Sequence, residues 1–349
     1  MNKFLIIISS SLVFASSNIM DHALPSLSKY GFFKNPIKLQ ITVDGIIPYK
    51  IASPLFSDYA EKLRFIMIPN SKTISTIDNR LIFPIGTTII KTFYYPDDFR
   101  KINSNRRLLE TRLLIKSKNE WIAIPYVWNE EQTDAFLSIA GDRIPVSWIN
   151  KNGIKTKLLY SVPNMNQCKG CHVKNNILQP IGPKIRNLNM IYSFEGEEIN
   201  QLKKWISLGI IEPFDNIWAL PRTVNYENHN DGTLDERARA WLDINCAHCH
   251  SSGGPAETSG LYLEYEEKNL AKIGVMKRPI AAGRGSGSLN YTIVPGHPEL
   301  SIIDYRIRST DPGIMMPELS RHLTHIEGVK LISSWIKKMS FNNNDGDAK

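Results

Sequence analysis

The first half of the chain carries short runs of alternating or β-branched apolar residues, separated by turn-forming dipeptides. Runs of this kind are typical of antiparallel strands. Asn152-Gly153 stands between two of them and predicts a hairpin. The pattern predicts a β-rich, antiparallel sandwich-like domain over residues 25–160, with strands at Leu63–Ile68, Thr87–Tyr95, Arg112–Lys116, Trp121–Trp128, Ile144–Ile149 and Lys155–Tyr160.

After residue 160 the apolar spacing becomes helical. Thr233-Leu-Asp-Glu236 and Thr324-His-Ile-Glu327 both have the spacing of capping boxes, and each precedes an amphipathic stretch. A third stretch, Glu197–Leu208, has helical periodicity and ends at Gly209. This part of the sequence predicts two mainly α, cytochrome c-like modules over 161–227 and 228–340, and a polar, disordered tail over 341–349.

The N-terminus has the pattern of a secretory signal. Lys3 precedes an apolar stretch, Phe4–Phe14, and small residues follow it. The stretch is shorter than the roughly 20 apolar residues of a membrane-spanning helix. We therefore expect a signal peptide over about residues 1–20 and a periplasmic location, with no multi-span membrane protein. The sequence leaves a single uncleaved anchor open.

All four cysteines lie in two matching pentapeptides, Cys168-Lys-Gly-Cys171-His172 and Cys246-Ala-His-Cys249-His250. Cys-x-x-Cys-His is the attachment signature of c-type haem. Two thiols three residues apart can each add to one haem vinyl group, and the adjacent imidazole then serves as a proximal iron ligand. The sequence predicts two covalent haems, with Cys168, Cys171, Cys246 and Cys249 as attachment sites and His172 and His250 as iron ligands.

Two other interpretations of the cysteines are weaker. A zinc site built from two Cys-x-x-Cys knuckles does not require a histidine after each pair, yet both pairs here have one. Disulfides are usual in exported proteins, but here every cysteine belongs to a haem motif.

The remaining iron ligands are less certain from the sequence. Met316, in Met315-Met-Pro317, follows a Gly/Pro-rich loop and is the predicted second ligand of the second iron, since His/Met ligation is common in electron-transfer cytochromes. Met315, His322 and His325 are alternatives. For the first iron, Met165, Met190 and His229 are equal candidates, and an open iron is a further one.

Weaker signals surround the second motif. Pro255 could offer its carbonyl to the His250 ring, and Arg284 could pair with a haem propionate. Arg237 and Arg239 are expected on the solvated side of their helix.

Composition narrows the function further. The 349 residues carry a formal net charge of +8, with 42% hydrophobic and 22% charged residues. Lys and Arg are spread along the chain, which does not favour nucleic-acid binding. The positive charge favours acidic redox partner proteins, and peripheral membrane association stays open. No catalytic carboxylate pair or Ser/His/Asp set is apparent.

The chain resembles a bacterial family of exported dihaem c-type cytochromes. The resemblance rests on Pro54-Leu-Phe-Ser-Asp-Tyr-Ala60, Glu110-Thr-Arg112, Ile181-Gly-Pro-Lys184, Arg237-Ala-Arg239, Asn245-Cys-Ala-His-Cys-His250 and Met315-Met-Pro-Glu-Leu319. It implies an N-terminal region followed by two haem-binding motifs, with haem binding and electron transfer through the six motif residues. It implies no substrate.

The sequence therefore predicts an electron carrier rather than an enzyme. The alternatives are a dihaem peroxidase-like oxidoreductase with one open iron, and a haem-containing protein whose β-rich region binds a partner or a glycan.

Overall fold

A computed structural model describes residues 23–101, 104–319 and 321–340. The expected signal peptide and the expected tail lie outside these residues. The chain contains 27% strand and only 24% helix, the latter including seven short α-helices in the described part. The prediction of mainly α, cytochrome c-like modules is therefore wrong.

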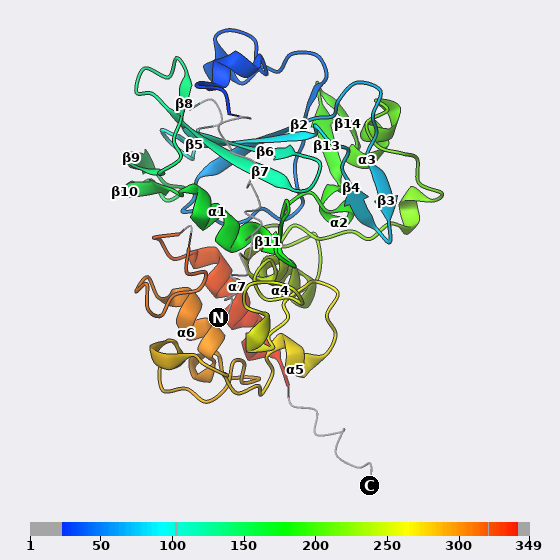
Figure 1. Ribbon diagram of the computed structural model, residues 1–349. Helices are drawn as coiled ribbons and strands as arrows, with labels where there is room; N and C mark the ends of the chain where they lie inside the picture. Colours follow the sequence, from blue (N-terminus) through cyan, green and yellow to red (C-terminus); the bar gives the residue numbers. More distant parts are fainter. Residues whose placement is uncertain (1–22, 102–103, 320, 341–349) are drawn as a thin grey trace, which may run out of the picture.

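The β-rich half is built on one six-stranded antiparallel sheet rather than two stacked sheets (Figure 1). Each strand follows its sequence neighbour within the sheet, apart from the short β3–β4 excursion. In spatial order the strands are β1 (Ile46–Pro48), β2 (Glu61–Met67), β5 (Thr88–Pro96), β6 (Arg106–Lys116), β7 (Trp121–Trp128) and β8 (Ala135–Leu137).

Both faces of this sheet are covered, which explains its long apolar runs. Phe32 and Phe33 of the N-terminal segment pack on one face, against Phe65 and Leu113. On the other face, Ile66 and Ile89 share a core with the helices of the second half of the chain.

Four two-stranded hairpins complete the strands. The Asn152-Gly153 hairpin is confirmed, and its aromatic residues pack on β5 through Trp148, which stacks on Tyr95 with 4.3 Å between ring centroids. The hairpins are β3 (Ser75–Ile77) with β4 (Arg80–Ile82), β9 (Asp142–Ile149) with β10 (Lys155–Val162), β11 (Val173–Lys174) with β12 (Ile177–Leu178), and β13 (Ile191–Phe194) with β14 (Glu197–Asn200).

The helices are short and lie mainly below the sheet (Figure 1). They are α1 (Met165–His172), α2 (Ile185–Leu188), α3 (Gln201–Ser207), α4 (Leu234–Leu242), α5 (Leu270–Ile273), α6 (Ile302–Arg308) and α7 (Ile326–Lys338).

Tertiary contacts override two local helix predictions. Glu197 to Asn200 form β14 instead of a first helical turn, and the Asn200 side chain caps α3 by accepting from the amides of Leu202 and Lys203. At α7 the hydroxyl of Thr324 bonds the carbonyl of Arg308 instead of capping the helix. The capping box of Thr233 and Glu236 is confirmed at α4.

The loop over residues 54–60 connects the sheet half of the molecule to the segment that precedes α7 through hydrogen bonds and ring stacking. The carboxylate of Asp58 accepts from the backbone amides of His322 and Leu323 at 2.7–2.9 Å. The Phe56 ring stacks on the His325 ring at 4.3 Å. These contacts hold the two halves of the chain together around the region described next.

Within the described part of the chain, no helix has both the length and the apolar character needed to cross a membrane.

Candidate functional site

The first motif lies on α1, directly after β10. Pro163 ends the strand, and the next residue, Asn164, begins the helix with a capping box in which Asn164 and Gln167 exchange side-chain and backbone hydrogen bonds. Sequence reasoning missed this helix, although Asn164-x-x-Gln167 is a recognisable signal for it. Cys168 and Cys171 thus lie one turn apart, with His172 at the end of the helix.

The second motif follows α4 without a break. α4 continues into a short π-helical segment, Asp243–Ala247, which contains Cys246. Such wide turns are often found at functional sites. The amides of Cys249 and His250 then both donate to the carbonyl of Cys246, which closes the motif into a compact turn.

The two motifs lie side by side. The Cys249 thiol contacts the carbonyl of Gly170, in the first motif, at 3.9 Å. The Cys249 thiol also lies beside the Cys171 thiol, and its interaction with Cys171, together with that of His248, lowers the pKa of Cys171. All four cysteines are free. Cys171 of the first motif and Cys249 of the second therefore lie next to each other.

A cavity opens beside each motif. The first has about 1220 Å³ of unfilled space, including its mouth, and lies between the sheet and the helices. Cys168, Cys171 and His172 line it. Its other walls come from the sheet, from the loop over residues 180–183, and from α4 and α7.

The second cavity has about 1860 Å³ of unfilled space, including its mouth. Cys246, Cys249 and His250 line it, together with Pro255 and residues of α6. His248 and Met316 line both cavities. Each motif thus has its two thiols and its imidazole in the wall of one cavity, and the two cavities adjoin, with Cys171 lining both.

The hydrogen bonds of the two motif histidines leave one ring nitrogen free in each. The Nδ1 of His172 lies 2.8 Å from the carbonyl oxygen of Gln179, which can only accept, so Nδ1 carries the proton. The Nδ1 of His250 lies 3.2 Å from the hydroxyl of Ser259, whose own hydrogen goes to the Ala256 carbonyl. Both rings therefore have an unprotonated Nε2, the form that binds a metal.

Burial keeps both rings neutral. It lowers the pKa of His172 to about 3, against the hydrogen bond to Gln179, and that of His250 to about 4. Pro255 lines the cavity, but its carbonyl is not the partner of His250; the Ser259 hydroxyl has that role.

The candidates for the second ligand of the second iron fall in different places. Met316 lines the cavity of His250, whereas the buried Met315 and the half-exposed His322 line neither cavity. His325 lines the first cavity, but its Nδ1 accepts a 3.0 Å hydrogen bond from the indole of Trp241. The neutral ring then carries its proton on Nε2, so neither nitrogen is available to a metal. Ligation by Met316 stays a prediction, and its position supports it.

None of the candidates for the first iron lines the cavity that contains His172. Met165, Met190 and His229 are all absent from its walls, and the His229 ring contacts Arg237 at 3.1 Å. Arg284 likewise lines neither cavity and pairs with Asp311 at 2.7 Å.

Arg237 and Arg239 are buried, so their expected place on the solvated side of the helix is wrong. Arg237 donates to the carbonyl of Tyr226, and Arg239 to the carbonyls of Glu264 and Glu267. They tie the preceding and following loops to α4, since guanidinium groups satisfy several carbonyls at once.

Sequence reasoning also missed the cations in the cavity walls. The first cavity is lined by Arg64, Lys91, Arg112 and Arg321, and the second by Lys277, Arg278 and Arg306. Lys91 is the one charged residue of the apolar strand β5, whereas Arg64 and Arg112 belong to strands with further charged residues, so no sequence signal set these two apart.

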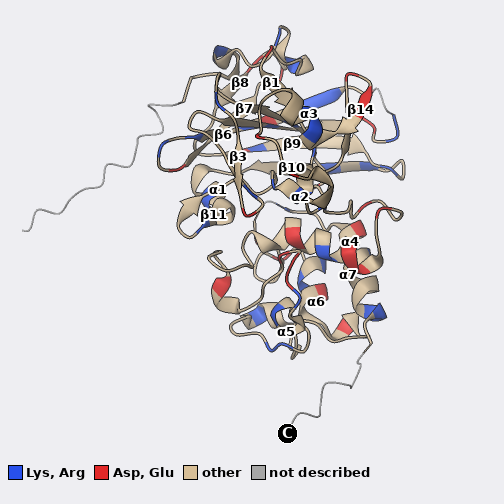
Figure 2. Cartoon of the chain, turned by 90° about the vertical axis from the view of Figure 1, so that its right-hand side faces the viewer, with Lys and Arg blue, Asp and Glu red and all other residues tan. Residues whose placement is uncertain are grey.

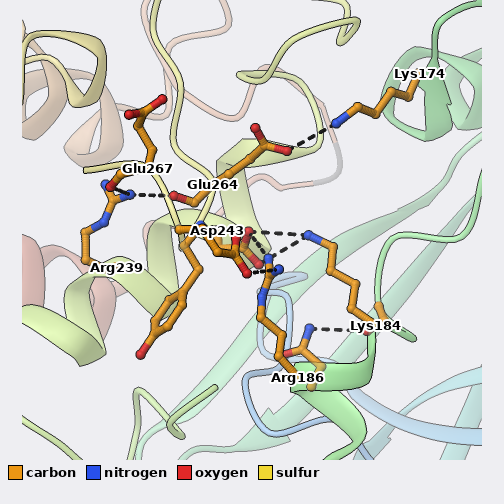
Figure 3. Close-up of polar contacts among 11 residues, drawn as sticks. Lys174, Lys184, Arg186, Arg239, Asp243, Glu264 and Glu267 are labelled. Carbon is orange, nitrogen blue, oxygen red and sulfur yellow. Dashed lines mark hydrogen bonds and ion pairs between the residues drawn. The ribbon is translucent and has the colours of Figure 1, made fainter. Parts of the chain in front are cut away.

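A buried ion network joins the two motif regions. Asp243 is only 1% exposed and begins the π-helical segment of the second motif. Figure 3 shows Lys184 and Arg186, which follow the first motif, reaching its carboxylate. The Lys184 ammonium lies 3.3 Å from both oxygens, the Arg186 guanidinium lies 2.5 Å from Oδ1, and the amide of Tyr265 also donates to Oδ1 at 3.2 Å.

No protein-family model, curated protein or solved structure matches this chain. Among the residues that the structure describes, no group of three or more His, Cys, Asp or Glu side chains is arranged to hold a metal ion.

We expect Asp243→Asn to lower the free energy of unfolding by about 3–5 kcal/mol, because it leaves two cations beside an uncharged amide in a buried site. Urea unfolding at neutral pH measures this. Asp78→Asn is the control: it breaks the Asp78–Arg80 pair, whose side chains are 82% and 76% exposed, and should cost less than about 1 kcal/mol. Equal losses in the two variants would contradict the assigned role of Asp243.

The same network predicts a pH dependence. Burial alone would raise the pKa of Asp243, but Lys184 and Arg186 lower it below its usual value. The stabilisation is therefore fully present above the unfolded-state pKa of about 3.9 and is lost as the pH falls through the lower folded-state pKa. Urea unfolding measured over this acid range should therefore show the free energies of unfolding of the wild type and Asp243→Asn becoming more similar as the pH falls.

Proposed function

We propose that the chain is an exported dihaem c-type protein that carries electrons between redox partners. The observation that carries the proposal is that each Cys-x-x-Cys-His motif lines one of two adjoining cavities, with Nε2 of both motif histidines left free by the hydrogen bond at Nδ1. These residues fit covalently attached haem, which needs two thiols and one neutral imidazole on one wall of a cavity.

When bound, haem supplies one-electron chemistry at its iron. The protein residues orient the ligands and control the surroundings. The Gln179 carbonyl and the Ser259 hydroxyl fix the rotation of the two imidazoles and increase their basicity. The apolar part of each lining excludes water, and Met316 offers a soft thioether that favours the reduced iron.

The contact between Cys171 and Cys249 supports electron exchange between the two sites. One attachment position of each motif lies directly against the other, and His248 and Met316 line both cavities. The two cofactors would thus act as a connected pair rather than as separate centres.

Redox partner proteins with acidic docking surfaces would suit the charge of the chain. Figure 2 shows Lys and Arg over both the sheet and the helical part, interspersed with Asp and Glu. With a net charge of +8, the surface would favour acidic partners through long-range attraction. The periplasm is the expected compartment, because the leader pattern and the haem motifs both call for export.

Covalent attachment is directly measurable. Full-length protein from a periplasm with cytochrome maturation machinery should have the mass of the processed polypeptide plus two haems, and acid–acetone should not remove the colour. Cys168→Ala/Cys171→Ala should lose one haem, and Cys246→Ala/Cys249→Ala the other. A wild-type mass equal to that of the bare polypeptide would refute the proposal.

The two adjacent methionines offer a matched pair for the axial ligand. Met316→Ala should abolish the ferric thioether charge-transfer band of one haem and lower its midpoint potential, because the thioether stabilises Fe(II). Met315→Ala should leave both unchanged, since Met315 lines neither cavity. Visible spectroscopy and redox titration give both readouts. An unchanged band in Met316→Ala, or its loss in Met315→Ala, would contradict the assignment.

A second candidate function is a peroxidase-like oxidoreductase with an open first iron. The observation in its favour is that Met165, Met190 and His229 all lie away from the first cavity, while the nitrogens of His325 are both engaged. The first cavity thus offers no ligand other than the shared Met316 among the candidates considered.

Cyanide distinguishes the two candidates. If the first iron is open, cyanide should change the visible spectrum of one haem only, and Cys168→Ala/Cys171→Ala should abolish the change. If both irons have two protein ligands, the wild-type spectrum should not respond at millimolar cyanide.

A further inference from the structure

Three cations form a row across the sheet wall of the first cavity. Arg64 on β2 is paired in register with Lys91 on β5, and Lys91 with Arg112 on β6. Directly paired residues point to the same face of a sheet, and all three side chains line the cavity of His172. Like charges placed opposite each other destabilise a sheet, so this arrangement needs a compensating interaction.

Among the residues that the structure describes, one of the three cations makes an ion pair. The Arg112 guanidinium makes a two-pronged ion pair with Glu110, with both distances 2.6 Å. Glu110 is fully buried and also accepts from the Tyr160 hydroxyl at 2.5 Å, which fixes its position.

The other two cations have no carboxylate partner among the residues that the structure describes. Arg64 Nη2 is buried and makes no hydrogen bond there. The Lys91 ammonium rests over the Phe93 ring at 4.7 Å, and no ion pair joins it. Burial, together with the charges of Arg64 and Arg112, lowers the pKa of Lys91 well below its usual value, so an anion beside the amine would restore its charged form. A cation without an ion pair in such a wall is costly, so the site is complementary to an anion that enters the cavity.

We infer that Arg64 and Lys91 bind the two propionate carboxylates of the haem attached to Cys168 and Cys171. This inference rests on the proposed function. Two uncompensated positive charges match two carboxylates, and Arg64 can bind a carboxylate in the bidentate manner that guanidinium geometry favours. The sheet wall would thereby orient the first haem, which is attached to α1.

The same cations could bind a free dicarboxylate instead, and a redox experiment separates the two sources. Redox titration of the full-length holoprotein should give two steps, of which one moves to lower potential in Arg64→Gln. Loss of a positive charge near one haem makes its ferric form less costly. Lys91→Gln should move the same step, and Arg64→Lys should restore most of the wild-type potential.

Arg80→Gln is the matched control, since it removes the same charge from an exposed position on β4. Arg80→Gln should leave the midpoint potentials of both redox steps unchanged. All variants should retain two haems by intact mass, which makes the change of potential independent of haem attachment.

Three results would overturn the inference. The first is wild-type potentials in both Arg64→Gln and Lys91→Gln, with haem retained. The second is a spectral shift of the wild-type holoprotein on adding succinate that Arg64→Gln abolishes, since the cations would then bind a free dicarboxylate. The third is a wild-type chain without covalent haem, in which case the proposed function fails as well; intact mass identifies this case before any titration.

Discussion

The buried carboxylate of Asp243 is the constraint on which the arrangement of the two motifs depends. It begins the π-helical segment that contains Cys246, and it is bound by Lys184 and Arg186, which follow the first motif. A carboxylate that is 1% exposed tolerates little displacement of its partners, because without them its charge would be desolvated and unpaired. The network therefore fixes the distance between two segments that share little other regular structure.

The cavities follow from this arrangement. Pro163 and the Asn164 capping box place α1 directly after the strand β10. The second motif follows α4 in the helical half of the chain. The second cavity is lined almost wholly by residues 245–319, with Gly170 and Cys171 from the first motif. The first cavity is closed by the sheet and by α7 together, and the loop over residues 54–60 joins these walls through Asp58 and Phe56.

The electrostatic character of the first cavity differs from that of an ordinary protein core. Its sheet wall combines apolar residues with a row of cations, of which Arg112 alone has a carboxylate partner within the described part of the chain. A fold selected for stability alone would have no reason to accumulate like charges there. The row is therefore best understood as part of a binding site, as are the free Nε2 atoms of His172 and His250.

The sequence by itself determined the elements whose signals are local. The strands of the sheet half, the Asn152-Gly153 hairpin, the Thr233 capping box and the two Cys-x-x-Cys-His motifs depend on residues close together in the chain. Only the tertiary structure decided which residues face the cavities. It excluded Met190 and His229 from the first cavity, buried Arg237 and Arg239, turned Glu197 to Asn200 into a strand, and aligned Arg64, Lys91 and Arg112 in one row. Strand register and burial arise from contacts between distant segments, and neither periodicity nor spacing along the chain contains that information.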